Sequence, residues 1–177
     1  MANPLYDNLI GKHATNDACF LRQPGKPTVS FRQFSERTSQ VANLLLKHGL
    51  KPGDRVAVQA SKTIEMVILY GATIQAGGVF LSLNTDYKKD EISYFIKDAS
   101  PKIFVCDPQK RIELEDIADQ VASQVLTLDK DGQGSLQSQA NMLSKTFNTI
   151  DRGPDDLVAL LYTSGTTGRS KGAMLTQ

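Results

Sequence analysis

The chain has 177 residues, of which 40% are hydrophobic and 22% are charged, a balance typical of a soluble globular protein with a core of ordinary domain size. Twenty lysine and arginine residues against nineteen acidic residues leave a net charge of +1, and no long block of one sign suits a nucleic-acid backbone or an anionic membrane. These numbers argue against overall disorder and against nucleic-acid binding, and they favour small-molecule chemistry.

Beyond the first thirty residues, helical and strand patterns alternate, which predicts an α/β fold with a mostly parallel sheet flanked by helices. Ser30 and Gln33 are spaced as a capping box, and the apolar residues after them keep helical spacing until Gly49, so the first helix is predicted over 31–48. Further strands are predicted over 55–60, 79–83, 102–106 and 125–128, and further helices over 62–76, from about residue 88, and over 111–121.

The last third of the chain begins with a change of composition. Residues 129–144 are rich in Gly, Gln, Ser and Asn, which predicts a surface loop. The apolar run 157–161 then predicts a buried strand, and the glycine-rich segment 162–172 begins where that strand ends.

This segment, YTSGTTGRSKG, has the side chains of a phosphate-binding loop. Gly165, Gly168 and Gly172 allow backbone conformations that other residues avoid, so main-chain N–H groups can turn inward and bind an anion. A flexible linker or an exposed hairpin turn is the structural alternative, but linkers usually lack a preceding apolar strand and two cations. The groups that suit a triphosphate or a leaving pyrophosphate are the hydroxyls of Thr163, Ser164, Thr166, Thr167 and Ser170 and the cations Arg169 and Lys171.

A Walker A loop is a second possibility for the same segment. That loop requires the pattern G-x-x-x-x-G-K-[ST]. Counting from Gly165 puts Ser170 where the second glycine belongs and Gly172 where the hydroxyl belongs. The pattern of a P-loop nucleotide hydrolase therefore fails at these two positions.

Segment 162–172 resembles the signature phosphate loop of the adenylate-forming superfamily, which contains acyl-CoA synthetases, peptide-synthetase adenylation domains and luciferases. Segments 29–34 and 75–84 resemble two earlier blocks of that superfamily, and the three blocks stand in the expected order. The resemblance runs from about residue 28 to the end of the chain. It implies that the sheet and its helices are part of the large N-terminal domain of an adenylate-forming enzyme.

Within the superfamily, the chain is similar to the malonyl-CoA synthetase branch in segments 83–87, 94–99 and 168–176. Ser170 and Ser82 replace prolines that are common in the wider superfamily. The first replacement is typical of the malonate branch, and neither removes a group that the phosphate contacts require.

The resemblance implies a ligase that works in two steps. A small carboxylic acid attacks the α-phosphate of Mg²⁺-bound ATP to give an acyl-adenylate and pyrophosphate, and the thiol of coenzyme A then displaces AMP. Malonate is the expected acid, with a short or medium monocarboxylate as the alternative. Lys171 would neutralise the charge that builds on the leaving pyrophosphate. The residues that would hold the β- and γ-phosphates are Thr163, Ser164, Gly165, Thr166, Thr167, Gly168, Arg169, Ser170 and Lys171.

The resemblance also implies that residues 1–177 are the N-terminal portion of an AMP-binding domain, ending after the phosphate loop and without the C-terminal domain. The adenine, magnesium, acid and coenzyme A contacts would then lie outside this chain, and neither a catalytic residue nor a metal ligand is assigned in it. We therefore expect the chain alone to be inactive. A helix directly after Ser170 would favour a hydrolase, a strand across 173–176 would favour the ligase, and a lack of any ATP effect would favour a catalytically silent nucleotide-binding module.

The polar candidates outside the loop are expected to be structural. His13 and His48 have no partner at metal-ligand spacing, and His48 is suited to the negative end of a helix. Lys62 and Glu65 are expected on a solvated helix face, and Asp107, which precedes a proline, is expected in a turn.

The cysteines and the apolar stretches indicate the cellular context. Cys19 and Cys106 are far apart and outside any zinc spacing, so two buried, reduced thiols are expected. Residues 1–8 lack the pattern of a signal or transit peptide, which favours a cytoplasmic location. The most apolar stretch, 66–83, contains Gln75 and several glycines, so no membrane span is expected.

Overall fold

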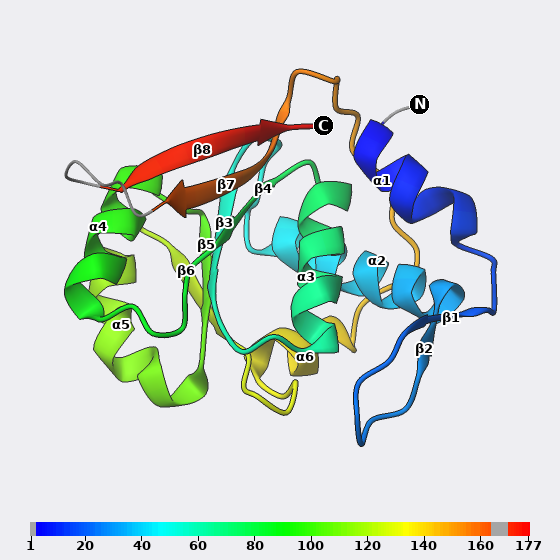
Figure 1. Cartoon of the computed structure of the whole chain (residues 1–177), viewed down its shortest axis with the longest axis horizontal. Helices are drawn as coiled ribbons and strands as arrows, with labels where there is room; N and C mark the ends of the chain where they lie inside the picture. The colour runs from blue at the N-terminus through cyan, green and yellow to red at the C-terminus, as the bar shows by residue number, and fades with distance from the viewer. Residues whose placement is uncertain (1–2, 164–169) are drawn as a thin grey trace.

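A computed structural model of the chain describes residues 3–163 and 170–177. Its centre is a six-stranded sheet in the order β6-β5-β3-β4-β7-β8 (Figure 1). Five strands are parallel, and β8 pairs antiparallel to β7, which confirms the predicted mostly parallel α/β fold. The strands are β3 (Arg55–Gln59), β4 (Val79–Ser82), β5 (Ile103–Cys106), β6 (Gln124–Thr127), β7 (Leu157–Thr163) and β8 (Lys171–Thr176).

Helices cover both faces of the sheet (Figure 1). Strand residues alternate between the two faces, as the pleat requires: Val56 and Val58 enter one hydrophobic cluster, and Ala57 between them enters the other. The first cluster packs under α1 (Pro4–Leu9), α2 (Phe31–Lys47), α3 (Ile64–Gln75) and α6 (Ser135–Ala140), and the second under α4 (Lys89–Ala99) and α5 (Arg111–Asp119).

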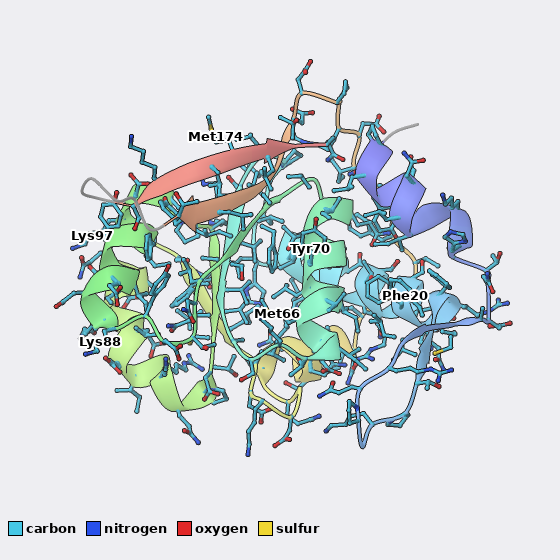
Figure 2. The ribbon with its side chains drawn as sticks, in the orientation of Figure 1. Phe20, Met66, Tyr70, Lys88, Lys97 and Met174 are labelled. Atoms are coloured by element: carbon cyan, nitrogen blue, oxygen red, sulfur yellow. The ribbon has the colours of Figure 1, made fainter. Side chains whose placement is uncertain are left out.

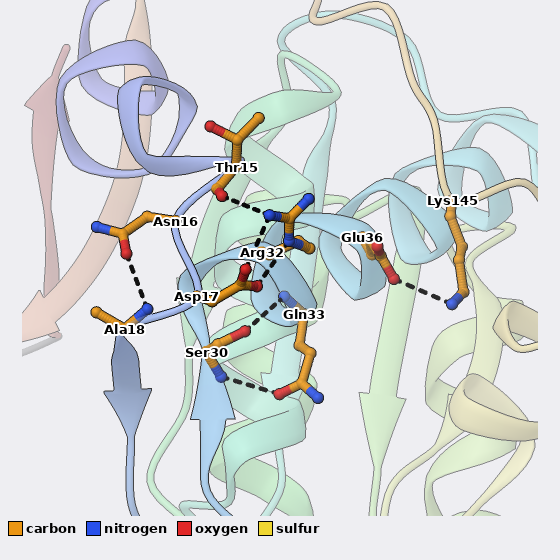
Figure 3. A network of polar contacts seen from close by, with 9 residues as sticks. All are labelled: Thr15, Asn16, Asp17, Ala18, Ser30, Arg32, Gln33, Glu36 and Lys145. Atoms are coloured by element: carbon orange, nitrogen blue, oxygen red, sulfur yellow. Dashed lines mark hydrogen bonds and ion pairs between the residues drawn. The ribbon is translucent and has the colours of Figure 1, made fainter.

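The start of α2 confirms the predicted capping box (Figure 3). The hydroxyl oxygen of Ser30 accepts from the backbone N–H of Gln33 at 3.2 Å, and the Gln33 side chain accepts from the N–H of Ser30 at 3.0 Å. Beside it, Arg32 of the same helix makes an ion pair with Asp17 at 2.7 Å and donates to the carbonyl of Thr15 at 2.8 Å. These contacts fasten the segment before the short hairpin of β1 (Cys19–Leu21) and β2 (Val29–Ser30) to α2.

One predicted loop contains a helix. Residues 129–144 include α6, in which Leu136 and Ala140 are 1% exposed and join the first hydrophobic cluster. The two apolar residues lie one helical turn apart and therefore point the same way. The hydroxyl oxygen of Ser135 accepts from the N–H of Thr127 at 2.9 Å, which ties the start of the helix to the end of β6.

Two further expectations were wrong, because tertiary partners decide exposure. Glu65 does not lie on a solvated face: its carboxylate pairs with Arg37 at 2.8 Å, and its side chain is only 17% exposed. Lys62 is exposed, as predicted, but it precedes α3, which begins at Ile64. Cys106 is buried in β5 as predicted, and burial raises the pKa of its thiol to about 11, but Cys19 is exposed because its short hairpin lies at the surface.

The predictions for His48 and Asp107 agree with the structure. His48 caps the C-terminal end of α2, and its ring Nε2 lies 3.2 Å from the amide oxygen of Gln139. Asp107 accepts from the N–H of Gln109 at 2.8 Å and begins the short 3-10 turn Pro108–Lys110. No helix within the described parts of the chain is both long and apolar enough to cross a membrane.

Candidate functional site

The candidate site lies at the edge of the sheet where the parallel strands have their carboxyl ends, which is where open α/β sheets usually bind ligands. Strand β7 ends there at Thr163, and β8 begins at Lys171. These two residues face each other across the antiparallel pair, so the predicted phosphate loop is the connection of a hairpin. The predicted residues Ser164, Gly165, Thr166, Thr167, Gly168 and Arg169 lie outside the described residues.

Three of the predicted site residues are described, and they form the two ends of this connection. Thr163 ends the first strand, and Ser170 and Lys171 lead into the second. The hydroxyl of Thr163 lies 3.5 Å from the carbonyl oxygen of Lys171, at the limit of a weak hydrogen bond. The side chains of Thr163 and Lys171 are exposed, so a hydroxyl donor and an ammonium group are both available to an anion.

Gly172 has a different role from the one that the sequence predicted. It lies inside β8, opposite Tyr162, and it is not among the described glycines with positive φ. A Cβ atom at this position would meet the ring of Tyr162 at 3.5 Å, which is an ordinary contact. Gly172 therefore belongs to the strand pair, while Gly165 and Gly168 lie outside the described residues.

Helix α4 lies beside the hairpin and contacts it in β7 and at the residue just before β8 (Figure 1). The hydroxyl of Tyr94 donates to the carbonyl of Ser170 at 3.1 Å, and the hydroxyl of Tyr162 donates to the carboxylate of Asp98 at 2.5 Å. Burial, followed by the hydrogen bond to Asp98, raises the pKa of Tyr162, so this hydroxyl keeps its proton at neutral pH. The sequence offered segment 94–99 only as a point of resemblance and no role for these two side chains.

A second polar group, at the end of β3, fixes the turn after β4. The amide nitrogen of Gln59 donates to the carbonyls of Asn84 and Tyr87, both at 3.0 Å, and the ammonium of Lys110 donates to the carbonyl of Thr85 at 2.7 Å. Gln59 is 1% exposed, and its amide oxygen has no hydrogen-bond partner among the described residues. Sequence reasoning missed Gln59, although a glutamine at the end of an otherwise apolar strand was a visible signal.

A hollow of about 560 Å³ opens between the ends of β3 and β4. The chain leaves β3 towards α3 on one face of the sheet and leaves β4 towards α4 on the other, so the hollow occupies the crevice that such a change of direction creates. Because β4 is also the neighbour of β7, the hollow lies on the same edge as the hairpin. It is lined by Ala60, Ser61, Lys62, Met66, Ser82, Leu83, Asn84 and Thr85.

The comparisons with known proteins agree with this arrangement. The family model of AMP-binding enzymes matches residues 11–177. MatB from Rhodopseudomonas palustris, in its apo crystal structure, is 48% identical over 99% of this chain and 35% of its own, with a TM-score of 0.96. The crystal structure of ATP-bound MatB is 49% identical with the same coverage and a TM-score of 0.96. Tyrocidine synthase 2 from Brevibacillus parabrevis is 37% identical over 147 residues, which are 83% of this chain and 4% of the synthase. The chain thus spans about a third of MatB and a small part of the curated synthase.

Proposed function

The chain belongs to the AMP-binding enzyme family, and from that premise we propose that it is the N-terminal portion of the adenylation domain of an ATP-dependent acid–thiol ligase. The reaction would join a small carboxylic acid to coenzyme A through an acyl-adenylate. The remaining parts of the active site would come from the rest of the full-length protein, since the chain covers 35% of MatB.

The observation that carries this proposal is the strand that follows the loop. In a Walker A site a helix begins directly after the loop and turns its N-terminal N–H groups towards the phosphates. Here residues 171–176 form β8, which runs back along β7. The segment after Ser170 therefore offers no helix N-terminus to a triphosphate. This favours the ligase over the P-loop hydrolase.

The proposed chemistry gives the hairpin ends a part in the first step. The acid carboxylate attacks the α-phosphorus of ATP, the bond to the bridging oxygen breaks, and pyrophosphate leaves with the electron pair. Thr163 and Lys171 would donate to the β- and γ-phosphates together with the loop residues between them, and Lys171 would offset the negative charge that grows on the leaving group.

Magnesium would shield the phosphates of ATP in this reaction, and such an ion usually takes one or two protein carboxylates. Within residues 3–163 and 170–177, no group of three His, Cys, Asp or Glu side chains could hold a metal ion. We therefore assign no metal ligand here and derive no step through the metal.

Malonate is the acid that we propose. It is supported by the resemblance of segments 83–87, 94–99 and 168–176 to malonyl-CoA synthetases and by the likeness of the whole chain to MatB. The match to a peptide synthetase at 37% identity supports the adenylation step alone, because it does not test the thiol that accepts the acyl group.

The test is pyrophosphate exchange by the full-length protein with acetate, malonate, methylmalonate and longer acids. We expect exchange to depend on an acid and to be fastest with malonate. In Lys171→Ala we expect a loss of about a hundredfold, because a cation at the leaving group is removed. The matched control, Lys97→Ala, removes an exposed lysine of α4 (Figure 2) and should exchange like the natural protein.

Two outcomes would contradict parts of this proposal. A strong preference for a monocarboxylate would overturn malonate and keep the ligase. ATP hydrolysis without acid-dependent exchange would overturn the ligase itself. Acyl transfer is read separately, as acid-dependent consumption of the coenzyme A thiol.

A further inference from the structure

We propose that Tyr94 and Asp98 of helix α4 are positioning residues that clamp the two ends of the phosphate loop. The inference rests on the proposed function for what the loop binds, but it rests on the structure for the clamp. Each of the two side chains makes one hydrogen bond: Asp98 reaches Tyr162 in β7, and Tyr94 reaches Ser170, the residue just before β8.

The spacing on the helix makes a double contact possible. Tyr94 and Asp98 are four residues apart, so they lie on the same face of α4, one above the other. Asp98 accepts from Tyr162, the residue before the last one of β7, and Tyr94 donates to Ser170, the residue just before β8. One rigid helix therefore contacts the chain both where it enters the loop and where it leaves.

Aromatic packing restricts the orientation of the hydroxyls of Tyr94 and Tyr162. The ring of Phe95 is 3% exposed and lies with its centroid 4.5 Å from the ring of Tyr162 and 5.4 Å from the ring of Tyr94. The rings of Tyr94 and Tyr162 are also neighbours, with their centroids 6.4 Å apart. Phe95 also contacts the ring of Tyr87, which belongs to the turn that Gln59 holds. Rings packed in this way leave each hydroxyl few directions, so the hydrogen bonds form with little loss of rotamer freedom.

The clamp has a function that ordinary packing would not have. Loop N–H groups bind a phosphate well only when they already point at it, because ordering them on binding costs affinity. A contact at each end fixes the positions of Tyr162 and Ser170, between which the loop begins and ends. Loss of either hydrogen bond should therefore weaken ATP binding and leave the affinity for coenzyme A and the thermal stability nearly unchanged.

The experiment compares hydroxyl deletions in the full-length protein. Tyr94→Phe and Tyr162→Phe keep the rings and remove one hydrogen bond each, and Tyr70→Phe is the matched control. Tyr70 lies on α3 at the other face of the sheet and stacks edge-on against Phe80 (Figure 2). We expect the KM for ATP to rise about threefold to tenfold in the first two variants, with kcat, the KM for coenzyme A and the melting temperature close to those of the control.

Two replacements of Asp98 test the hydrogen bond from the acceptor side. Asp98→Ala should behave like Tyr162→Phe, while Asp98→Asn retains an oxygen that can accept from the tyrosine and should restore most of the affinity for ATP. Because Tyr162→Phe and Asp98→Ala break the same bond, the double variant should be no worse than either single one. A double variant that multiplies the two effects would overturn the assignment of this bond.

A second readout does not depend on activity. Hydrogen exchange of a peptide that spans residues 170–177 should be faster in Tyr94→Phe than in Tyr70→Phe. The carbonyl of Ser170 has then lost the Tyr94 hydroxyl that holds the start of β8, so this end of the strand opens more often. If the natural protein forms no adenylate but this exchange is faster, the proposed function fails and the clamp stands. If the natural protein forms the adenylate, but neither the KM for ATP nor the exchange changes in Tyr94→Phe, the clamp is overturned and the proposed function stands.

Discussion

Replacing Gln59 by glutamate changes only the polar end of a buried side chain, and it tests how the carboxyl edge of the sheet is held together. The amide nitrogen of Gln59 donates to the carbonyls of Asn84, Thr85 and Tyr87 at 3.0, 3.4 and 3.0 Å, and the residue is 1% exposed. In Gln59→Glu a carboxylate would face three carbonyl oxygens with no proton to offer. We therefore expect a large and pH-dependent loss of stability.

The magnitude follows from the protonation state of the new side chain. Burial and the three carbonyl oxygens both disfavour the charged form, so the pKa of the glutamate in the folded chain should lie above its unfolded value of about 4.3. A protonated glutamate can still donate one hydrogen bond. At pH values where the side chain is protonated, the loss of unfolding free energy should therefore be about 1 to 3 kcal/mol. An ionised one is an uncompensated buried charge, so at high pH the cost should reach about 3 to 5 kcal/mol.

The direction of the pH dependence follows from proton binding. Between the unfolded and the folded pKa, the folded variant holds a proton that the unfolded variant has lost, so its stability falls as the pH rises, by at most about 1.4 kcal/mol per pH unit. The assay is urea unfolding of the chain at pH 5 and pH 8, with the natural sequence measured at both values. Gln59→Met, which has no titratable group, should cost about 1 to 3 kcal/mol at both. A Gln59→Glu cost that is the same at pH 5 and pH 8 would refute the reasoning.

Three other predictions concern the stability and the burial of the fold around the site. Glu65→Ala should lower the free energy of unfolding by about 1.5 to 3 kcal/mol, because it breaks a partly buried charged hydrogen bond, whereas Glu115→Ala, which breaks an exposed helix pair, should cost about 0.5 kcal/mol or less. Cys19 should react with a thiol reagent at pH 8 in the folded chain and Cys106 only in denaturant, since burial raises the pKa of the Cys106 thiol to about 11; two thiols that react at one rate would contradict this. Gly77→Ala should cost about 1 to 2 kcal/mol in urea unfolding because φ is +73° there, and a neutral effect would contradict the geometry.

The sequence predicted the sheet and most of its helices because the signals for them are local. The helix predicted over 31–48 is observed at Phe31–Lys47, since a capping box and a glycine mark its ends. Helix α6 was missed because its six residues offer only Leu136 and Ala140 as apolar positions, and their burial depends on the core that the rest of the chain supplies.

The candidate site was predictable only in its composition. The glycines, hydroxyls and cations of segment 162–172 can be read directly, and their contacts with phosphate stay a prediction for the residues between Thr163 and Ser170. The support from α4 could not be foreseen, because Tyr94 and Ser170 are 76 positions apart, and a tyrosine that donates to a backbone carbonyl leaves no mark on the sequence of its partner.

The central claim is that the full-length protein activates a carboxylic acid by attack on the α-phosphorus of ATP. The most direct test supplies malonate with ¹⁸O in its carboxylates, together with ATP and coenzyme A, and follows the label by mass spectrometry. The account predicts AMP that carries one labelled oxygen, because the acid oxygen that attacked phosphorus stays with AMP when the thiol displaces it. Unlabelled AMP, or label in inorganic phosphate with ADP as the second product, would contradict it.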